Sequence, residues 1–203
     1  MSDCDAEMGA DFKSFQMKDL SIYARAKQLL RTRIAASPVP EDPGHAENTL
    51  YWLLQLDPEA DQALRLAALA HDIERAREGR LQRHDWTDYD AFKAAHAAIG
   101  ADITRKILLE AGLEPELREE VCRLVSRHES GGDPRSDLLK DADSLSYFDH
   151  NLPFYFQREG WNETLRRARW GYQRLSPRAR NYYPKIEADS EELGRLLECA
   201  SEN

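Results

Sequence analysis

The chain has 203 residues, of which 41% are hydrophobic, and it carries a formal net charge of −9 at pH 7. This length predicts one domain with its own core. No apolar run reaches about 18 residues, which argues against a membrane-spanning helix, and the first residues lack the order of a signal peptide. We therefore expect a cytoplasmic protein, and its acidic charge disfavours a nucleic acid as partner.

Apolar residues at helical spacing follow most of the chain. A first helix is predicted over residues 18–36, and the proline-rich segment from Ser37 to Gly44 ends it because proline cannot continue a helix. His45 opens the next helix, which ends near Asp57. A third helix, from Glu59 to about Arg77, is apolar on most sides and is expected to be central.

The second half of the chain continues in the same way. Its predicted helices are Asp88–Gly112, Pro115–Ser130, Asp137–His150, Trp161–Arg174 and Ser176–Tyr183. Ser176 followed by Pro177 is typical of a helix start. No run of alternating strand residues is found, so we expect an all-α, orthogonal helical bundle. It would form a single domain, with a core at about residues 40–150 and the N-terminal helix and C-terminal helices over 160–200 packed on it.

Histidines and aspartates form an ordered series along these helices. Its members are His45, His71, Asp72, His96, His128 and Asp143. Imidazole nitrogens and carboxylate oxygens together suit divalent iron, manganese, cobalt or zinc, whereas calcium and magnesium prefer oxygen ligands alone. The series therefore predicts a site for one or two divalent metal ions, with ligands from several helices.

His71 and Asp72 are adjacent in the sequence, and adjacent residues on a helix do not normally face the same point. Neighbours on a helix point about 100° apart, so they share one metal only if the ion lies beside the helix, between the two directions. His96 and His128 would hold a second ion, bridged to the first by Asp72.

Each of these residues also has an ordinary structural interpretation. A single histidine on an apolar helix is more often a hydrogen-bonded core residue than a metal ligand, and only the ordered set favours metal binding. For Asp141 we favour a solvated residue or a partner that orients a ligating imidazole. His84 and His150 are interpreted as surface or orienting residues.

The series resembles the pattern of the HD superfamily of metal-dependent phosphohydrolases, His…His-Asp…Asp on a helical bundle, over about residues 40–150. Ala142-Asp-Ser-Leu145 is similar to the closing Ala-Asp-x-Leu of that family, which makes Asp143 the ligand. His96-Ala-Ala-Ile-Gly100 and His128-Glu-Ser-Gly131 look like the dinuclear branch, including bacterial enzymes that split dinucleoside tetraphosphates. Residues 88–185 also look like an uncharacterised bacterial family of hypothetical proteins.

The resemblance implies hydrolysis of a nucleotide, or of a related phosphate ester or anhydride, by a metal-activated water. Asp72 and Arg75 would be catalytic, and Arg75, Arg77 and Lys93 would bind the phosphorylated substrate. The chain departs from the cyclic-dinucleotide HD-GYP pattern, because His71-Asp-Ile-Glu-Arg75 replaces its His-Asp-x-Gly-Lys. Specificity for cyclic dinucleotides is therefore not supported.

Two other functions use the same ligands. Some HD-fold proteins hold two irons and activate oxygen, and a non-catalytic module would hold metal and nucleotide without turnover. The arginines of the last helices, Arg166, Arg167, Arg169, Arg174, Arg178 and Arg180, are interpreted as a solvated face in preference to a substrate surface. The substrate and the oligomeric state stay open.

Overall fold

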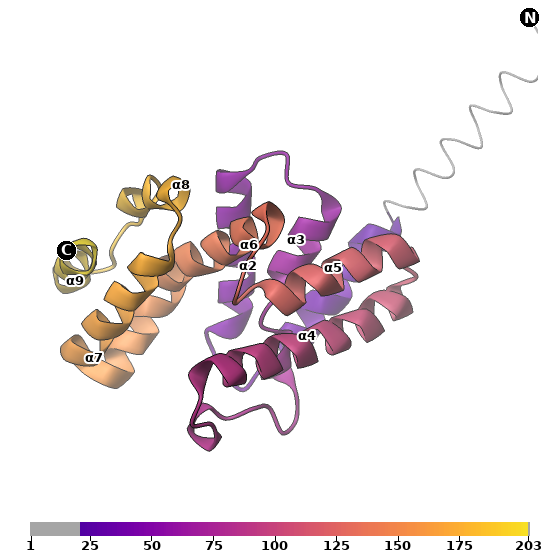
Figure 1. The fold of residues 1–203 in the computed structure, drawn as a ribbon, viewed down its shortest axis with the longest axis horizontal. Helices are drawn as coiled ribbons and strands as arrows, with labels where there is room; N and C mark the ends of the chain where they lie inside the picture. The colour runs from indigo at the N-terminus through magenta and orange to yellow at the C-terminus, as the bar shows by residue number, and fades with distance from the viewer. Residues whose placement is uncertain (1–20, 203) are drawn as a thin grey trace, which may run out of the picture.

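The computed structural model describes residues 21–202, so positions 18–20 of the predicted first helix lie outside the described residues. Within this part of the chain the regular elements are all helical and no strand occurs (Figure 1). The prediction of an all-α protein is thus confirmed. No described helix combines the length and the apolar content that crossing a bilayer requires.

A helix over residues 21–34 comes first. The labelled α-helices that follow are α2 (Asp42–Leu56), α3 (Gln62–Ala70), α4 (Tyr89–Ala111), α5 (Pro115–Arg127), α6 (Pro134–Ser146), α7 (Leu152–Arg174), α8 (Pro177–Arg180) and α9 (Glu191–Ser201). Short 3₁₀ turns lie at Ile73–Ala76 (η1), Arg83–Asp85 (η2) and Tyr183–Lys185 (η4), and a π turn (η3) at Tyr147–Asn151 joins α6 to α7.

Helix α3 lies at the centre of the bundle, as its apolar composition predicts. Its residues from Leu66 to Ala70 are at most 1% exposed. Helices α2, α5 and α6 pack against it, and α4 pairs with α5 (Figure 1). Fully burying one leucine contributes roughly 1.5 to 3 kcal/mol. The helix is therefore a rigid support for whatever follows its C-terminal end.

Capping residues fix the ends of α4 close to the predicted limits. Asp88 accepts hydrogen bonds from the backbone N–H groups of Asp90 and Ala91. At the other end Gly112 adopts the left-handed conformation, with φ of 85°, which favours glycine. Ser176 likewise accepts from the N–H of Ala179 and starts α8 as predicted.

The predicted third helix is too long. Helix α3 ends at Ala70, and Asp72, with φ of −100° and ψ of 16°, leaves the helical conformation before η1. The apolar spacing continues through Ile73 and Ala76, which are both buried. Hydrophobic periodicity therefore cannot reveal this break, which depends on the polar contacts of the two residues after α3.

The region after Ser146 also differs from the prediction. The helix expected to reach His150 passes into the π turn, and α7 begins at Leu152 rather than at Trp161. Gly160, with φ of 71° and ψ of −176°, interrupts α7, so the predicted start corresponds to its second half. This extra helical segment brings the N-terminal half of α7 beside the predicted metal ligands.

Candidate metal centre

The six predicted ligands come together from five parts of the fold. His45 lies in the first turns of α2, His71 and Asp72 follow α3, and His96 lies in the middle of α4. His128 is the C-cap of α5, and Asp143 lies on α6. Residues nearly 100 positions apart in the sequence therefore meet at one interior point.

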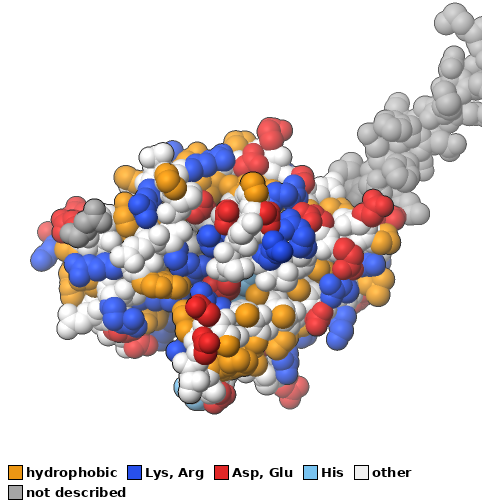
Figure 2. All heavy atoms as spheres, viewed as in Figure 1, with side chains coloured by type: hydrophobic (Ala, Val, Ile, Leu, Met, Phe, Trp, Pro, Cys, Tyr) orange, Lys and Arg blue, Asp and Glu red, His pale blue; other side chains and the backbone are white. Residues whose placement is uncertain are grey.

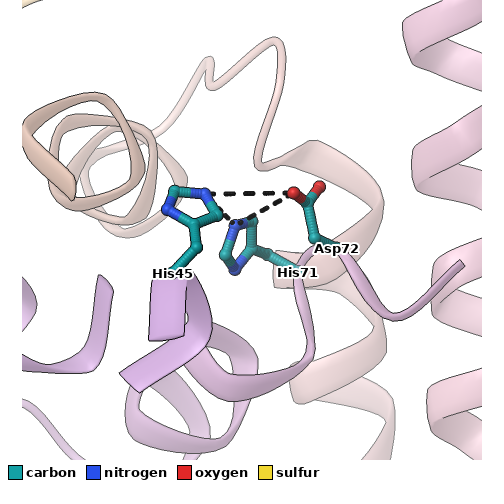
Figure 3. A group of neighbouring side chains, drawn as sticks. All are labelled: His45, His71 and Asp72. Atoms are coloured by element: carbon teal, nitrogen blue, oxygen red, sulfur yellow. Dashed lines mark hydrogen bonds and ion pairs between the residues drawn. The ribbon is translucent and has the colours of Figure 1, made fainter. Parts of the chain in front are cut away.

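One group consists of His45, His71 and Asp72, whose possible ligand atoms all lie within 4.8 Å of one another. In Figure 3 the three side chains point toward one another. The Nε2 atoms of His45 and His71 are 3.2 Å apart, and each is within 3.9 Å of Asp72 Oδ2. Asp143 completes the group, since its Oδ1 is 3.1 Å from His45 Nε2 and 3.6 Å from His71 Nε2.

A second group consists of Asp72, His96 and His128. Asp72 Oδ1 is 2.9 Å from His96 Nε2 and 3.9 Å from His128 Nε2. The two oxygens of Asp72 thus face different groups, Oδ2 toward His45 and His71 and Oδ1 toward the other two histidines. A carboxylate in this position can bridge two cations.

The end of α3 explains how adjacent residues serve one site. His71 keeps helical angles, while Asp72 has left the helix, so the constraint of about 100° between neighbours on a continuous helix does not apply. His71 is completely buried, whereas Asp72 lines the cavity above it. The break after α3 therefore allows the side chains of His71 and Asp72 to face the same point, which a continuous helix would not.

Each histidine of the first group, and His128 of the second, uses its Nδ1 atom for a contact away from the centre. His71 Nδ1 donates to the carbonyl of Ala68 at 2.9 Å, and His128 Nδ1 donates to the carbonyl of Val125 at 2.8 Å. His45 Nδ1 lies 2.8 Å from Ser146 Oγ, whose own proton goes to the carbonyl of His45. A neutral imidazole with its proton on Nδ1 carries a free lone pair on Nε2, which can bind a metal ion.

These lone pairs make the centre suitable for a cation. Two neutral Nε2 atoms 3.2 Å apart, as in His45 and His71, cannot hydrogen-bond to each other, because both are acceptors. His128 Nε2 is buried and has no hydrogen-bond partner among the described residues. A divalent metal ion would satisfy these acceptors together with the Asp72 and Asp143 carboxylates, so the residues fit such an ion.

The protonation states of His71 and of the two carboxylates agree with this fit. Burial lowers the pKa of His71 and so favours its neutral form. Burial alone would raise the pKa of Asp72, but the neighbouring His71 and Arg75 and a hydrogen bond from His96 outweigh it and hold that pKa well below its usual range. Burial opposes ionisation of Asp143 in the same way, but the neighbouring His45 and His71 lower its pKa. Both carboxylates are therefore ionised and available as ligands.

Glu74 is a functional residue that the sequence analysis missed. Its Oε2 atom is 3.0 Å from His96 Nδ1, and its Oε1 atom accepts from the N–H of Leu81. Burial opposes protonation of His96, but hydrogen bonds to Asp72 and Glu74 raise its pKa to about 10. In the sequence Glu74 reads only as a charge that dilutes the nearby arginines. Its role depends on the turn of η1, which spacing does not predict.

Arg75 lies where the sequence analysis expects it, next to the metal ligands. Its Nε atom is 2.9 Å from Asp42 Oδ1, and its Nη1 atom is 3.4 Å from Asp72 Oδ2. Asp42 is completely buried, and Arg75 lines the cavity. The guanidinium is thus fixed at the edge of the ligand cluster.

The other two predicted substrate contacts are placed differently. Arg77 does not line the cavity above the ligands and faces a separate shallow pocket with Arg33 and Pro38. Lys93 is held by Asp90 at 3.2 Å and by Glu129 at 3.9 Å, and it does not line that cavity either. A position close to Asp72 in sequence does not ensure that a side chain faces the site, because the chain turns at η1.

The cavity above the ligands has a volume of about 810 Å³. Arginines of α7 border it, although the sequence analysis favoured a solvated face for the C-terminal arginines. Those that line it are Arg158, Arg166, Arg167 and Arg174. In Figure 2 basic side chains surround the hollow centre of the face between α7 and α4.

Asp141, His150 and His84 lie outside the predicted ligand series, and the structure gives each of them a different environment. Asp141 is buried and accepts from the backbone N–H and the hydroxyl of Ser176, so it joins α6 to the start of α8. His150 contacts the carbonyl of Glu41 at 3.1 Å. His84 is exposed and borders the cavity. The interpretation of Asp141 as a solvated residue or an orienting partner of an imidazole is therefore wrong.

Comparison with known proteins finds one protein that is similar over part of the chain and one family whose model matches most of it. A CC-adding tRNA nucleotidyltransferase from Thermus thermophilus is 32% identical in an alignment of 129 residues that covers 58% of this chain. The chain thus spans only 29% of the length of that relative. No solved structure matches the chain. A family model matches residues 22–196, nearly the whole described part, and the chain belongs to that family, described as "Domain of unknown function (DUF4202)".

Proposed function

We propose that this protein is an HD-type, metal-dependent phosphohydrolase that acts on a nucleotide or on a related phosphate ester or anhydride. The observation that carries the proposal is the convergence of the Nε2 lone pairs of His45, His71 and His128 on the carboxylates of Asp72 and Asp143. Nitrogen and oxygen ligands of this kind suit iron, manganese, cobalt or zinc. A divalent ion held there lowers the pKa of water and polarises a phosphoryl oxygen.

The chain's own residues supply the remaining functions. Asp72 would hold two ions at a fixed separation, because its oxygens face the two ligand groups. Arg75, fixed by Asp42, would contact the phosphoryl group beside the ions. The cavity above them is large enough for a small phosphorylated molecule, since ligand pockets commonly enclose about 300 to 1,000 Å³.

The similarity to a CC-adding tRNA nucleotidyltransferase supports a ligand of the nucleotide class. That enzyme's name describes nucleotide addition to tRNA, and the shared segment is 29% of its length. We carry over from it only the chemical class of a phosphate-containing nucleotide.

The proposal is tested by comparing purified wild-type protein with Asp72→Ala. Wild type supplied with manganese, iron or cobalt is expected to bind metal and to hydrolyse a member of a broad nucleotide and phosphoester panel. Asp72→Ala should lose both properties, because it removes a ligand from each group. Asp102→Ala is the matched control, since Asp102 is exposed and pairs with Arg105 at 2.7 Å.

Two results would contradict the proposal. One is metal-loaded wild-type protein that hydrolyses nothing in the panel. The other is Asp72→Ala protein that keeps the turnover of the Asp102→Ala control. Metal content is measured on the same samples by elemental analysis, and circular dichroism shows whether each variant is folded.

A further inference from the structure

One wall of the cavity is formed by α7 and by the first turns of α4. Arg167 and Trp170 of α7 line it, together with Tyr89 and Phe92 of α4. This wall carries both aromatic rings and positive charge. It lies outside the six-residue ligand series, so the series does not explain it.

Most arginines around the cavity are neutralised by a carboxylate. The pairs are Arg75 with Asp42 at 2.9 Å, Arg158 with Glu41 at 2.6 Å, Arg166 with Glu163 at 2.5 Å and Arg174 with Glu129 at 3.2 Å. In each pair the guanidinium charge is already compensated within the protein. These arginines therefore add little net attraction for an anion.

Arg167 differs from them. Among residues 21–202 no carboxylate lies within ion-pair distance of its guanidinium. Its Nη1 atom donates to Tyr89 Oη at 3.0 Å, and the guanidinium lies 4.4 Å from the Trp170 ring centre and 5.6 Å from that of Tyr147. The side chain is thus held in a fixed position by aromatic groups, partly buried and without a direct ion pair.

A partly buried cation without a counter-ion is costly unless something compensates it. Aromatic rings offset a fraction of this cost, but a guanidinium has five N–H donors and the Tyr89 hydroxyl accepts only one of them. Arg83, which lies 5.0 Å from the Tyr89 ring centre, adds positive charge nearby. Arg167 lines the cavity, so an anionic group of a ligand there can accept a hydrogen bond from its guanidinium.

Arg167 and His96 are associated with different turns of α4, since Arg167 contacts Tyr89. Tyr89 and His96 are seven residues apart on α4, which corresponds to about 10 Å along the helix axis. The rings of Tyr89, Phe92 and His96 form a row, with centroids 6.2 Å and 6.4 Å apart. His96 and the Tyr89 contact of Arg167 thus mark two separate places along the cavity for anionic groups.

From this geometry we infer that Arg167 binds a second phosphate group of the substrate, about 10 Å from the phosphoryl group at the metal ligands. The inference rests on the proposed function for the identity of the first site, and it narrows the substrate class to molecules with two separated phosphate groups. Trp170 and Tyr89 hold the guanidinium in place.

The inference is tested with phosphonates, which the enzyme cannot hydrolyse. Isothermal titration of manganese-loaded protein compares linear alkane-1,n-bisphosphonates of increasing length with alkyl monophosphonates of equal length. The second phosphonate is expected to tighten binding about tenfold, with a maximum for chains that span about 10 Å. Arg167→Gln should lose this gain and Arg167→Lys should keep part of it. Arg169→Gln, two residues along α7 at an exposed position outside the cavity, should keep all of it.

Several outcomes would overturn the inference. One is a bisphosphonate that binds wild type no more tightly than the monophosphonate at any chain length. Another is Arg167→Gln protein that still binds the bisphosphonate more tightly. The third is a monophosphonate with a phenyl group in place of the second phosphonate that binds as tightly as the bisphosphonate. The wild-type length series decides the question even if Arg167→Gln does not fold. If the bisphosphonate gain depends on Arg167 while no panel compound is hydrolysed, the anion site stands and only the proposed hydrolysis fails.

Discussion

At the scale of single residues, each histidine of the candidate metal centre is held by a contact on its far side. His45, His71 and His128 each have an oxygen within 2.9 Å of Nδ1. His96 differs, because its Nδ1 partner is the Glu74 carboxylate. The second ligand group therefore depends on a buried charge that the first group does not need.

Replacing Glu74 with Gln is expected to weaken the second ligand group selectively. The amide removes the negative charge beside His96 Nδ1 and makes His96 a poorer ligand, and losing such a partner typically costs about 10- to 100-fold in metal affinity. Metal titration followed by elemental analysis should show two tightly bound ions in wild type and one in Glu74→Gln. The control is Glu78→Gln, at a position in the same segment outside the cavity. Two ions bound with wild-type affinity in Glu74→Gln would refute this role.

The order of ligand types in the sequence was enough to identify the six residues that the structure brings together. It could not identify Glu74 or Arg167. Glu74 meets His96 only because the chain turns at η1. Arg167 meets Tyr89 from 78 positions away because the aromatic side chain at the start of α4 reaches α7. Spacing along one chain carries no information about such contacts, which depend on packing.

At the scale of elements, the helix ends and breaks determine where functional groups lie. The end of α3 at Ala70 allows His71 and Asp72 to share a site, and the break at Gly160 separates the two halves of α7. Strong local signals, such as Asp88 and Gly112 at the ends of α4, made those limits predictable. The end of α3 and the break in α7 lack a comparable signal, since apolar residues continue past the first and Gly160 has several possible roles.

The break in α7 leads to a prediction about stability. Gly160, with φ of 71° and ψ of −176°, adopts a conformation that only glycine adopts readily. Gly160→Ala is therefore expected to lower the free energy of unfolding by about 1 to 3 kcal/mol. Gly194→Ala is the matched control: Gly194 lies inside α9, and its new Cβ would meet the Ala188 Cβ at an ordinary 3.7 Å.

In the control, alanine should raise the free energy of unfolding by about 0.5 to 1 kcal/mol, because glycine is a poor residue inside a helix. Urea unfolding of the two variants and wild type measures both changes. If Gly194→Ala lowered the free energy of unfolding and Gly160→Ala left it unchanged, the backbone at position 160 would not require glycine.

At the scale of the whole molecule, the candidate centre joins the helices of the bundle. Ligands from α2, α4 and α6, with others at the ends of α3 and α5, meet beside the buried central helix α3 (Figure 1). On the other side of the cavity, α7 supplies the basic and aromatic wall. The molecule thus places a candidate metal centre and a candidate anion site in one cavity.

Anomalous scattering from crystals of the protein grown with manganese or iron locates bound metal directly. We expect two anomalous peaks, one among His45, His71, Asp72 and Asp143 and one among Asp72, His96 and His128, with the Asp72 carboxylate between them. A single peak in the first group would show that the centre holds one ion. Crystals that contain the metal in solution but give no peak at these residues would contradict the central claim.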